Sequence, residues 1–209
     1  MFSSNVIKYP EESVALSIIL NLQRYVTEMY VIEVNADGDK GYPDNIVVEV
    51  GVCKVDLDRM DFDSIYNDII LLNPVDMGKT SLDWLTDTAG IDVRELYLGT
   101  PQEEVVSNVK ELLKGNEVAC FDVGVTFGRF LLYEPWDFTK EITVMSSISS
   151  RIPSNASPIV KTNLQERIGY AYSKLCPDDL ANIGEGRRAL HLAQMTSEIV
   201  IKLRKNGLY

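Results

Sequence analysis

The sequence predicts an α/β domain built on a mixed β-sheet that is flanked by helices. β-branched and apolar residues are concentrated in short runs, at 30–34 and 46–55, which follow one another across a short loop. The later part of the chain alternates helical patterns with short apolar runs, as in βα crossovers. Apolar residues make up 45% and charged residues 24% of the 209 residues, which is typical of one globular domain.

The first three strands are expected to form an antiparallel meander. Residues 30–34 are a short β-rich run, and residues 46–55 are a nearly continuous Val-rich run that is typical of a strand buried on both faces. A third strand is expected over 64–72, where Asn73 and Pro74 stop it. Because the connecting loops are short, antiparallel neighbours are the simplest arrangement.

The remainder of the chain is expected to supply helices and two further strands. Thr100, Pro101 and Glu103 form the pattern of a capping box, which opens a helix that Gly115 ends. Strands are expected over 117–123 and 141–145, and helices over 126–133, 162–175 and 187–205. Residues 149–161 are expected to be a loose loop over a site.

An additional helix is expected near the N-terminus. Ser13 can cap a helical pattern that runs to about Thr27. Its apolar run at 14–20 has acidic residues before it and no clean cleavage site after it, so we expect a packed helix and not a signal peptide. We therefore divide the chain into a helical extension, residues 1–29, and a domain, residues 30–209.

The cysteine count and the hydropathy indicate a cytoplasmic protein that does not enter a membrane. The three cysteines are an odd number without C-x-x-C spacing, which argues against a disulfide framework or a zinc site and fits a reducing compartment. His191 is the single histidine, so little remains for histidine-based metal sites or triads. No apolar run approaches the roughly 20 residues that a membrane span needs.

The charge is strongly acidic and uneven along the chain. The net charge is −11; residues 1–139 contain 10 Lys and Arg against 25 Asp and Glu, whereas residues 140–209 contain 10 against 6. Only the C-terminal third can therefore offer a basic surface to nucleic acid. The candidate nucleic-acid-binding residues are Arg187, Arg188, Lys202 and Arg204. The alternative is that they are solvated helix faces and a basic last turn that suits the helix dipole.

Four stretches, taken in order, carry a resemblance to a known family. They are "YVIEVNADG" with "NIVVEVGVCKVD", then "KTSLDWLTDTAGIDVRELYLGTPQEEVVSNVKELLKG", "EVACFDVGVTFGRFLL" and "GRRALHLAQMTSEIV". Together they resemble the DEDDh-type 3′–5′ exonucleases, which have a ribonuclease H-like fold. The resemblance implies a mixed five-stranded sheet flanked by helices, to which this chain adds an N-terminal helix.

The resemblance also implies a two-metal site. Family members bind two divalent ions through an Asp-x-Glu pair on the first strand, an Asp after the fourth strand and an Asp on the last helix. A His five residues before that last Asp acts as general base. Several carboxylates are needed because Mg²⁺ prefers hard oxygen ligands in an octahedral shell.

Carried onto this sequence, the family's site residues are mostly replaced. Glu33 and Asn35 stand at the Asp and Glu positions of the first strand, and Gly128 or Arg129 stands at the Asp position after the fourth strand. The nearest acid there is Asp122. We place Arg187 at the His position and Leu192 at the last Asp position.

This replacement predicts an exonuclease-like domain that has lost most metal-ligand carboxylates and the general-base histidine. We expect a non-catalytic module that binds single-stranded nucleic acid or a protein partner and needs no cofactor. The alternative is an active 3′–5′ exonuclease on DNA or RNA, dependent on Mg²⁺ or Mn²⁺. Its rearranged site would use Glu33, Asp37 and Asp122, with Glu33 and Asp37 as metal ligands.

Overall fold

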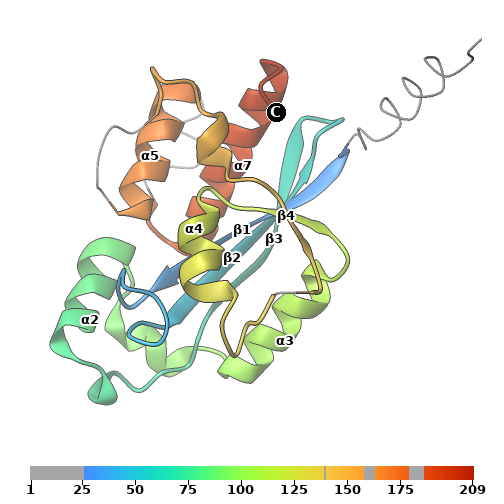
Figure 1. The fold of residues 1–209 in the computed structure, drawn as a ribbon. Helices are drawn as coiled ribbons and strands as arrows, with labels where there is room; N and C mark the ends of the chain where they lie inside the picture. The colour runs from blue at the N-terminus through green and yellow to red at the C-terminus, as the bar shows by residue number, and fades with distance from the viewer. Residues whose placement is uncertain (1–25, 139, 158–162, 179–185) are drawn as a thin grey trace, which may run out of the picture.

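A five-stranded mixed sheet with helices on both faces forms the centre of the molecule (Figure 1). The structure is a computed structural model that describes residues 26–138, 140–157, 163–178 and 186–209. The strand order is β3-β2-β1-β4-β5. The predicted fold class is thus confirmed, whereas residues 1–25, most of the predicted N-terminal helix and of the 1–29 extension, lie outside the described residues.

The predicted meander is present. β1 (Glu28–Ala36), β2 (Val47–Asp56) and β3 (Asp61–Ile69) pair antiparallel in chain order. β4 (Glu117–Ala119) and β5 (Thr143–Val144) extend the sheet by parallel pairing on the other side of β1. β1 is therefore the central strand, and its polar residues lie deep in the molecule.

Side chains alternate along β1 between two apolar layers, because successive residues of a strand point to opposite faces. Val31 belongs to a layer that also contains residues of α5 (Leu164–Leu175) and α7 (Ala189–Lys205). Ile32 and Val34 belong to the other layer, with α3 (Gln102–Leu113). By this parity Glu33 and Asn35 lie on the α7 face of β1.

A compact segment between β3 and α3 went unpredicted. It contains η1 (Pro74–Asp76), α2 (Lys79–Trp84), the π-helical turn η2 (Leu85–Ala89) and η3 (Val93–Leu98). Four of its residues are fully buried with Val48 of β2 in a third apolar cluster: Leu85, Ala89, Ile91 and Leu96.

The predicted capping box at Thr100 is wrong. The Thr100 hydroxyl donates to Asp68 Oδ1 on β3 at 3.0 Å, and α3 begins without a side-chain cap. A capping box is present earlier, at η3, where Asp92 and Glu95 exchange bonds with each other's backbone. The Thr100 hydroxyl therefore bonds to Asp68, a residue distant in sequence, and does not cap α3 as the local pattern predicts.

The fourth strand is shorter than predicted and leads directly into a helix. β4 ends at Ala119, and Asp122 then caps α4 (Val123–Thr126), which continues as the π-helical turn η4 (Phe127–Leu131). η5 (Ile148–Arg151) occupies part of the predicted loose loop at 149–161, of which 158–161 lie outside the described residues. The turn from β4 to α4 brings Phe121 and Thr126 next to Glu33.

Candidate functional site: a polar centre between the first strand and the last helix

Glu33 is the middle of a fully buried hydrogen-bonded cluster. Its Oε1 accepts from the Phe121 N–H at 2.6 Å and from the Thr196 hydroxyl on α7 at 3.1 Å. Its Oε2 accepts from the Thr126 hydroxyl at 3.3 Å. Burial raises the pKa of Glu33 to about 8, more than these hydrogen bonds lower it, and the charge of Asp122 raises it further. Burial therefore favours the protonated form of this carboxyl.

Asn35 lies two residues further along β1 and has its amide fully engaged. Its Nδ2 donates to Glu49 Oε2 on β2 and to the Arg187 carbonyl, both at 2.9 Å. Its Oδ1 accepts from Gln165 Nε2 on α5 at 2.8 Å. Both amide hydrogens are thus used and its oxygen already has a donor. Asn35 joins β1, β2, α5 and the start of α7 and acts as a structural connector.

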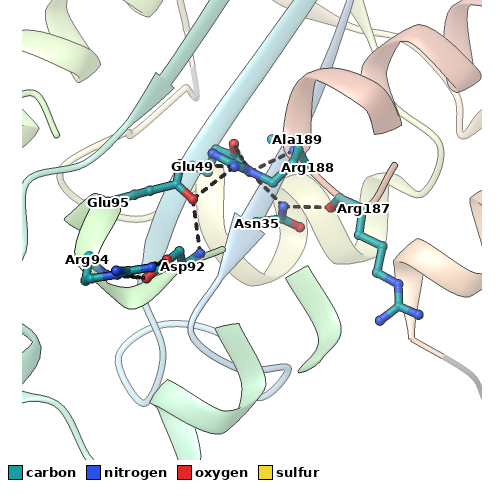
Figure 2. A network of polar contacts seen from close by, with 8 residues as sticks. All are labelled: Asn35, Glu49, Asp92, Arg94, Glu95, Arg187, Arg188 and Ala189. Carbon is teal, nitrogen blue, oxygen red and sulfur yellow. Dashed lines mark hydrogen bonds and ion pairs between the residues drawn. The ribbon is translucent and has the colours of Figure 1, made fainter. Parts of the chain in front are cut away.

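Glu49 and Arg188 form a partly buried ion pair at the start of α7 (Figure 2). Glu49 is fully buried, and its Oε1 accepts from Arg188 Nε at 2.7 Å. Its Oε2 accepts from the Ala189 N–H at 2.8 Å, so this carboxylate also satisfies a backbone donor in the first turn of α7. Arg188 Nη1 contacts Glu95 at 3.1 Å. A guanidinium therefore provides the positive charge beside Glu49.

The first turn of α7 lies unusually close to β2. A Cβ on Gly51 would lie 2.3 Å from the Leu190 backbone nitrogen, so only glycine fits there without displacing the helix. This close approach brings the Ala189 N–H within hydrogen-bond distance of Glu49. It also fixes the position of α7 along the sheet, at which Thr196 contacts Glu33.

On α7 the residue that contacts Glu33 is Thr196, whereas Leu192 is fully buried in the apolar layer and Arg187 precedes the helix. Our placement of the family's His and Asp at Arg187 and Leu192 stays a prediction. His191, the single histidine of the sequence, stands five residues before Thr196. His191 Nδ1 is buried and has no hydrogen-bond partner among the described residues.

After the fourth strand, the side chain that contacts Glu33 is that of Thr126. Our placement of the family's Asp at Gly128 or Arg129 stays a prediction. Asp122 lies close enough for its charge to affect Glu33, but its carboxylate caps α4 and pairs with Arg167 Nη2 at 2.7 Å. Asp122 therefore has a structural role in this geometry.

The proposed carboxylate trio does not assemble into a metal site. Asp37 Oδ1 accepts from the Ile46 N–H at 2.8 Å and closes the turn between β1 and β2. Across the described residues, no three His, Cys, Asp or Glu side chains come together so that they could hold a metal ion. The polar centre supplies one carboxyl, one amide and two hydroxyls, from Glu33, Asn35, Thr126 and Thr196. This donor set does not fit a pair of divalent ions.

The four candidate nucleic-acid-binding residues do not form one surface. Arg188 is engaged by Glu49 and Glu95. Arg187 is exposed, its side chain points away from this network (Figure 2), and its Nη1 donates to the Asp87 carbonyl. Lys202 and Arg204 lie in the last turn of α7, and at 1.5 Å per residue Arg204 is roughly 24 Å along the helix from Arg188. Arg204 Nη1 donates to the Tyr209 carbonyl at 3.3 Å.

A cavity of about 420 Å³ opens beside the Asn35 network. It lies between α5 and the residues before α7, and Gln165, Tyr170, Arg187 and Met195 are among its lining residues. Gln165 contacts Asn35, and Met195 precedes Thr196, so the cavity adjoins the polar centre. Arg187 is the one basic side chain that lines it within the part of the chain that the structure describes.

Solved structures of exonucleases share this fold. Cell-death related nuclease 4 (CRN-4) superposes with a TM-score of 0.61 at 14% identity, over 87% of this chain and 64% of that chain. The nuclease domain of 3′hExo, a DEDDh family member bound to rAMP, gives 0.57 at 12% identity, over 88% and 94%. E. coli Exonuclease I in complex with a dA16 oligonucleotide gives 0.61 at 8% identity, over 87% and 42%.

These comparisons show the fold of the DEDDh-type exonucleases, as the sequence resemblance predicted. The chain spans less than two thirds of the length of CRN-4 and less than half of Exonuclease I. No protein-family model and no curated protein matches the sequence.

Proposed function

We propose that this chain is an exonuclease-like module that acts by binding and does not cleave phosphodiesters by the two-metal mechanism. The observation that carries the proposal is the environment of Glu33. Two threonine hydroxyls, Thr126 and Thr196, contact this carboxyl, and no group of three acidic, His or Cys side chains that could hold a metal forms among the described residues. The polar centre is therefore complete as a set of hydrogen bonds without a cation.

The charge of the centre supports the same proposal. A two-metal site needs several ionised carboxylates to hold its ions. Glu33 is a single carboxyl, Asn35 is an amide, and the nearby carboxylate of Glu49 is already paired with Arg188. Two divalent cations would meet few anionic ligands and a guanidinium beside Glu49, which disfavours their binding.

The test is single-turnover degradation of 5′-labelled single-stranded DNA and RNA with Mg²⁺ and then Mn²⁺. Wild type is compared with Glu33→Gln, which keeps the size of the side chain. We expect no stepwise 3′ shortening by either protein, with circular dichroism establishing that both are folded. Shortening by wild type that disappears in Glu33→Gln would overturn the proposal.

The alternative, an active exonuclease with a rearranged site, has one observation in its favour. His191 stands five residues before Thr196, the spacing that the resemblance implies for a general base. Under this alternative His191→Ala lowers any cleavage at least as strongly as Glu33→Gln does. Under our proposal neither variant has an activity to lose.

Single-stranded nucleic acid is the first partner class to test for this module. The neighbours with the same fold include complexes with rAMP and with an oligonucleotide, and Arg187 lines the cavity beside Gln165. The measurement is oligonucleotide affinity against salt for wild type, Arg187→Gln, and Lys202→Gln with Arg204→Gln. Removal of one phosphate-binding side chain should reduce the slope of log affinity against log salt concentration by about 1. A salt slope unchanged by every variant would remove these residues from the proposal.

We keep the cytoplasm as the proposed compartment. All three cysteines, Cys53, Cys120 and Cys176, are buried free thiols, as expected in a reducing environment. None of the described helices has the length and apolar character that crossing a membrane requires.

A further inference from the structure

A second cavity, of about 370 Å³, lies between the β1–β2 loop and the segment that follows η4. We call it the aromatic groove. Its principal lining residues are Tyr42, Phe130, Pro135, Trp136, Glu103 and Glu134. None of them belongs to the polar centre around Glu33 and Asn35, so the groove is a separate feature of the surface.

Two tyrosines are stacked at the edge of the groove and exposed. The rings of Tyr42 and Tyr133 lie 5.7 Å apart at an interplanar angle of 22°, and the residues are 43% and 44% exposed. Phe130 and Trp136 also line the groove and are buried, and we call them its floor. The groove therefore combines buried aromatic rings with two exposed rings that a partner can reach.

The backbone holds this stack in place. The Tyr42 N–H donates to the Arg129 carbonyl at 2.9 Å, and the Tyr133 N–H donates to the Phe130 carbonyl at 3.1 Å. Gly41 has a φ of 93°, and a Cβ there would lie 2.9 Å from Arg129 Cβ. Glycine thus permits both the turn and the close approach, and the two tyrosines are preorganised before any partner arrives.

The charge of the groove selects the kind of partner. Glu103 and Glu134 are exposed, neither forms an ion pair with any residue that the structure describes, and no described Lys or Arg lines the groove. Bases of nucleic acid can stack on tyrosine, but phosphates would be repelled by the two carboxylates. An arginine guanidinium instead satisfies both features, because it stacks on aromatic rings and pairs with carboxylates through two parallel hydrogen bonds.

We propose that the aromatic groove binds an arginine-containing basic peptide segment of a partner protein. An arginine lies on the exposed face of the Tyr42–Tyr133 stack and pairs with Glu103 or Glu134, while the apolar floor holds a neighbouring side chain such as proline. This binding does not depend on whether the polar centre is catalytic.

The probe is a fluorescein-labelled short peptide of alternating arginine and proline, measured by fluorescence anisotropy with the full chain. A matched peptide of alternating glutamate and proline is the negative control. We expect saturable binding of the arginine peptide that weakens with added salt, and none of the glutamate peptide. Absence of binding by the arginine peptide, or equal binding of both peptides, would overturn the proposal.

Two double variants locate the binding surface. Glu103→Gln with Glu134→Gln and Tyr42→Ala with Tyr133→Ala should each weaken the arginine peptide by about tenfold or more, as expected for central contacts of an interface. Asp58→Asn with Asp63→Asn makes the same change in net charge on exposed residues outside the groove and should leave the affinity almost unchanged. Equal weakening by this control would mean general attraction to an acidic chain and would refute a specific site.

A third variant distinguishes loss of the aromatic contact from loss of the folded structure. Tyr42→Phe with Tyr133→Phe keeps the stacked rings and removes only the hydroxyls, so it should bind the peptide nearly as well as wild type. If it binds no better than the folded Tyr42→Ala with Tyr133→Ala variant, the aromatic faces are not the contact and the proposal fails.

Discussion

Thr196 Oγ1 on the last helix donates a hydrogen bond to Glu33 Oε1 on the central strand at 3.1 Å. The two residues are far apart in the sequence, and their contact joins α7 to the middle of the sheet. We therefore treat this contact and its surroundings as a neutral structural centre.

Glu33 should make stability depend on pH in the direction opposite to a salt-bridged acid. Its pKa is about 8 in the folded chain and 4.5 without burial. Between these values the unfolded chain has released the proton and the folded chain has kept it, so raising the pH favours unfolding. The stabilisation is fully present below pH 4.5 and is lost as the pH rises to about 8, at a slope of up to about 1.4 kcal/mol per pH unit.

The measurement is urea unfolding of wild type and Glu33→Gln across this pH range. Because the glutamine side chain does not titrate, the stability of wild type relative to the variant should fall as the pH rises. A relative stability that does not change with pH would mean that Glu33 is ionised in the folded chain.

Arg188 and Glu49 should be strongly coupled in stability. Arg188→Met leaves the fully buried Glu49 carboxylate without its cation and should destabilise the fold by about 2 kcal/mol or more. The double variant Glu49→Gln with Arg188→Met should lose less than the sum of the single variants, since no buried charge remains. Chemical denaturation gives the free energy of unfolding of wild type, both single variants and the double variant, and the coupling free energy between Arg188 and Glu49 follows from the four values.

A surface pair provides the control for this cycle. Lys54 and Glu28 are 2.9 Å apart, but their side chains are 35% and 54% exposed. Lys54→Met should therefore cost less than about 1 kcal/mol. If Arg188→Met costs no more than Lys54→Met, the ion pair does not fix the start of α7.

Gly51→Ala should destabilise the protein because of the close approach of α7. The new Cβ would meet the backbone of Leu190 at 2.3 Å, and backbone atoms cannot move aside as a flexible side chain can. We expect a loss of about 2 kcal/mol or more. Gly78→Ala is the matched control, because nothing lies within 4 Å of its Cβ position. Thermal unfolding that shifts equally for both variants would contradict the packing described for α7.

Much of the fold could be predicted from the sequence because its signals are local. The Val-rich run indicates β2, and the short loops indicate the meander, since period and turn chemistry are read from neighbouring residues. The Thr100 prediction is wrong because its hydroxyl bonds to Asp68, 32 residues earlier in the chain. The segment of α2 and η3 has weak local signals and is held by burial against Val48 of β2.

The site was less predictable because its contacts join residues that are distant in the sequence. Glu33 and Asn35 could be located because they lie on a clear strand. On α7 the residue that contacts Glu33 is Thr196 and not Leu192, and only the structure identifies this contact. The sequence places Arg188 on an open basic surface because Glu49, its ion-pair partner, is 139 residues away. An ion pair between residues that are distant in the chain produces no recognisable pattern in a single sequence.

The carboxylate set should be restorable, which gives a positive control for metal binding. Glu33→Asp, Asn35→Glu, Thr126→Asp and Thr196→Asp together recreate the donor types that the resemblance implies. A folded variant of this kind should bind Mn²⁺ at the polar centre, because Glu33, Thr126 and Thr196 are in contact in the natural chain and three of the new carboxylates then meet there. Isothermal titration calorimetry with Mn²⁺ would detect it, and a folded variant without any added Mn²⁺ affinity would show that these positions do not converge.

The absence of a two-metal site in wild type can be measured by the same Mn²⁺ titration of the natural chain beside Glu33→Gln. Weakly bound ions on the acidic surface should bind both proteins equally, so the comparison reports on the polar centre alone. We predict identical isotherms for the two proteins. Two tight Mn²⁺ sites in wild type that are lost in Glu33→Gln would contradict a neutral structural centre and would favour the alternative, a metal-dependent exonuclease.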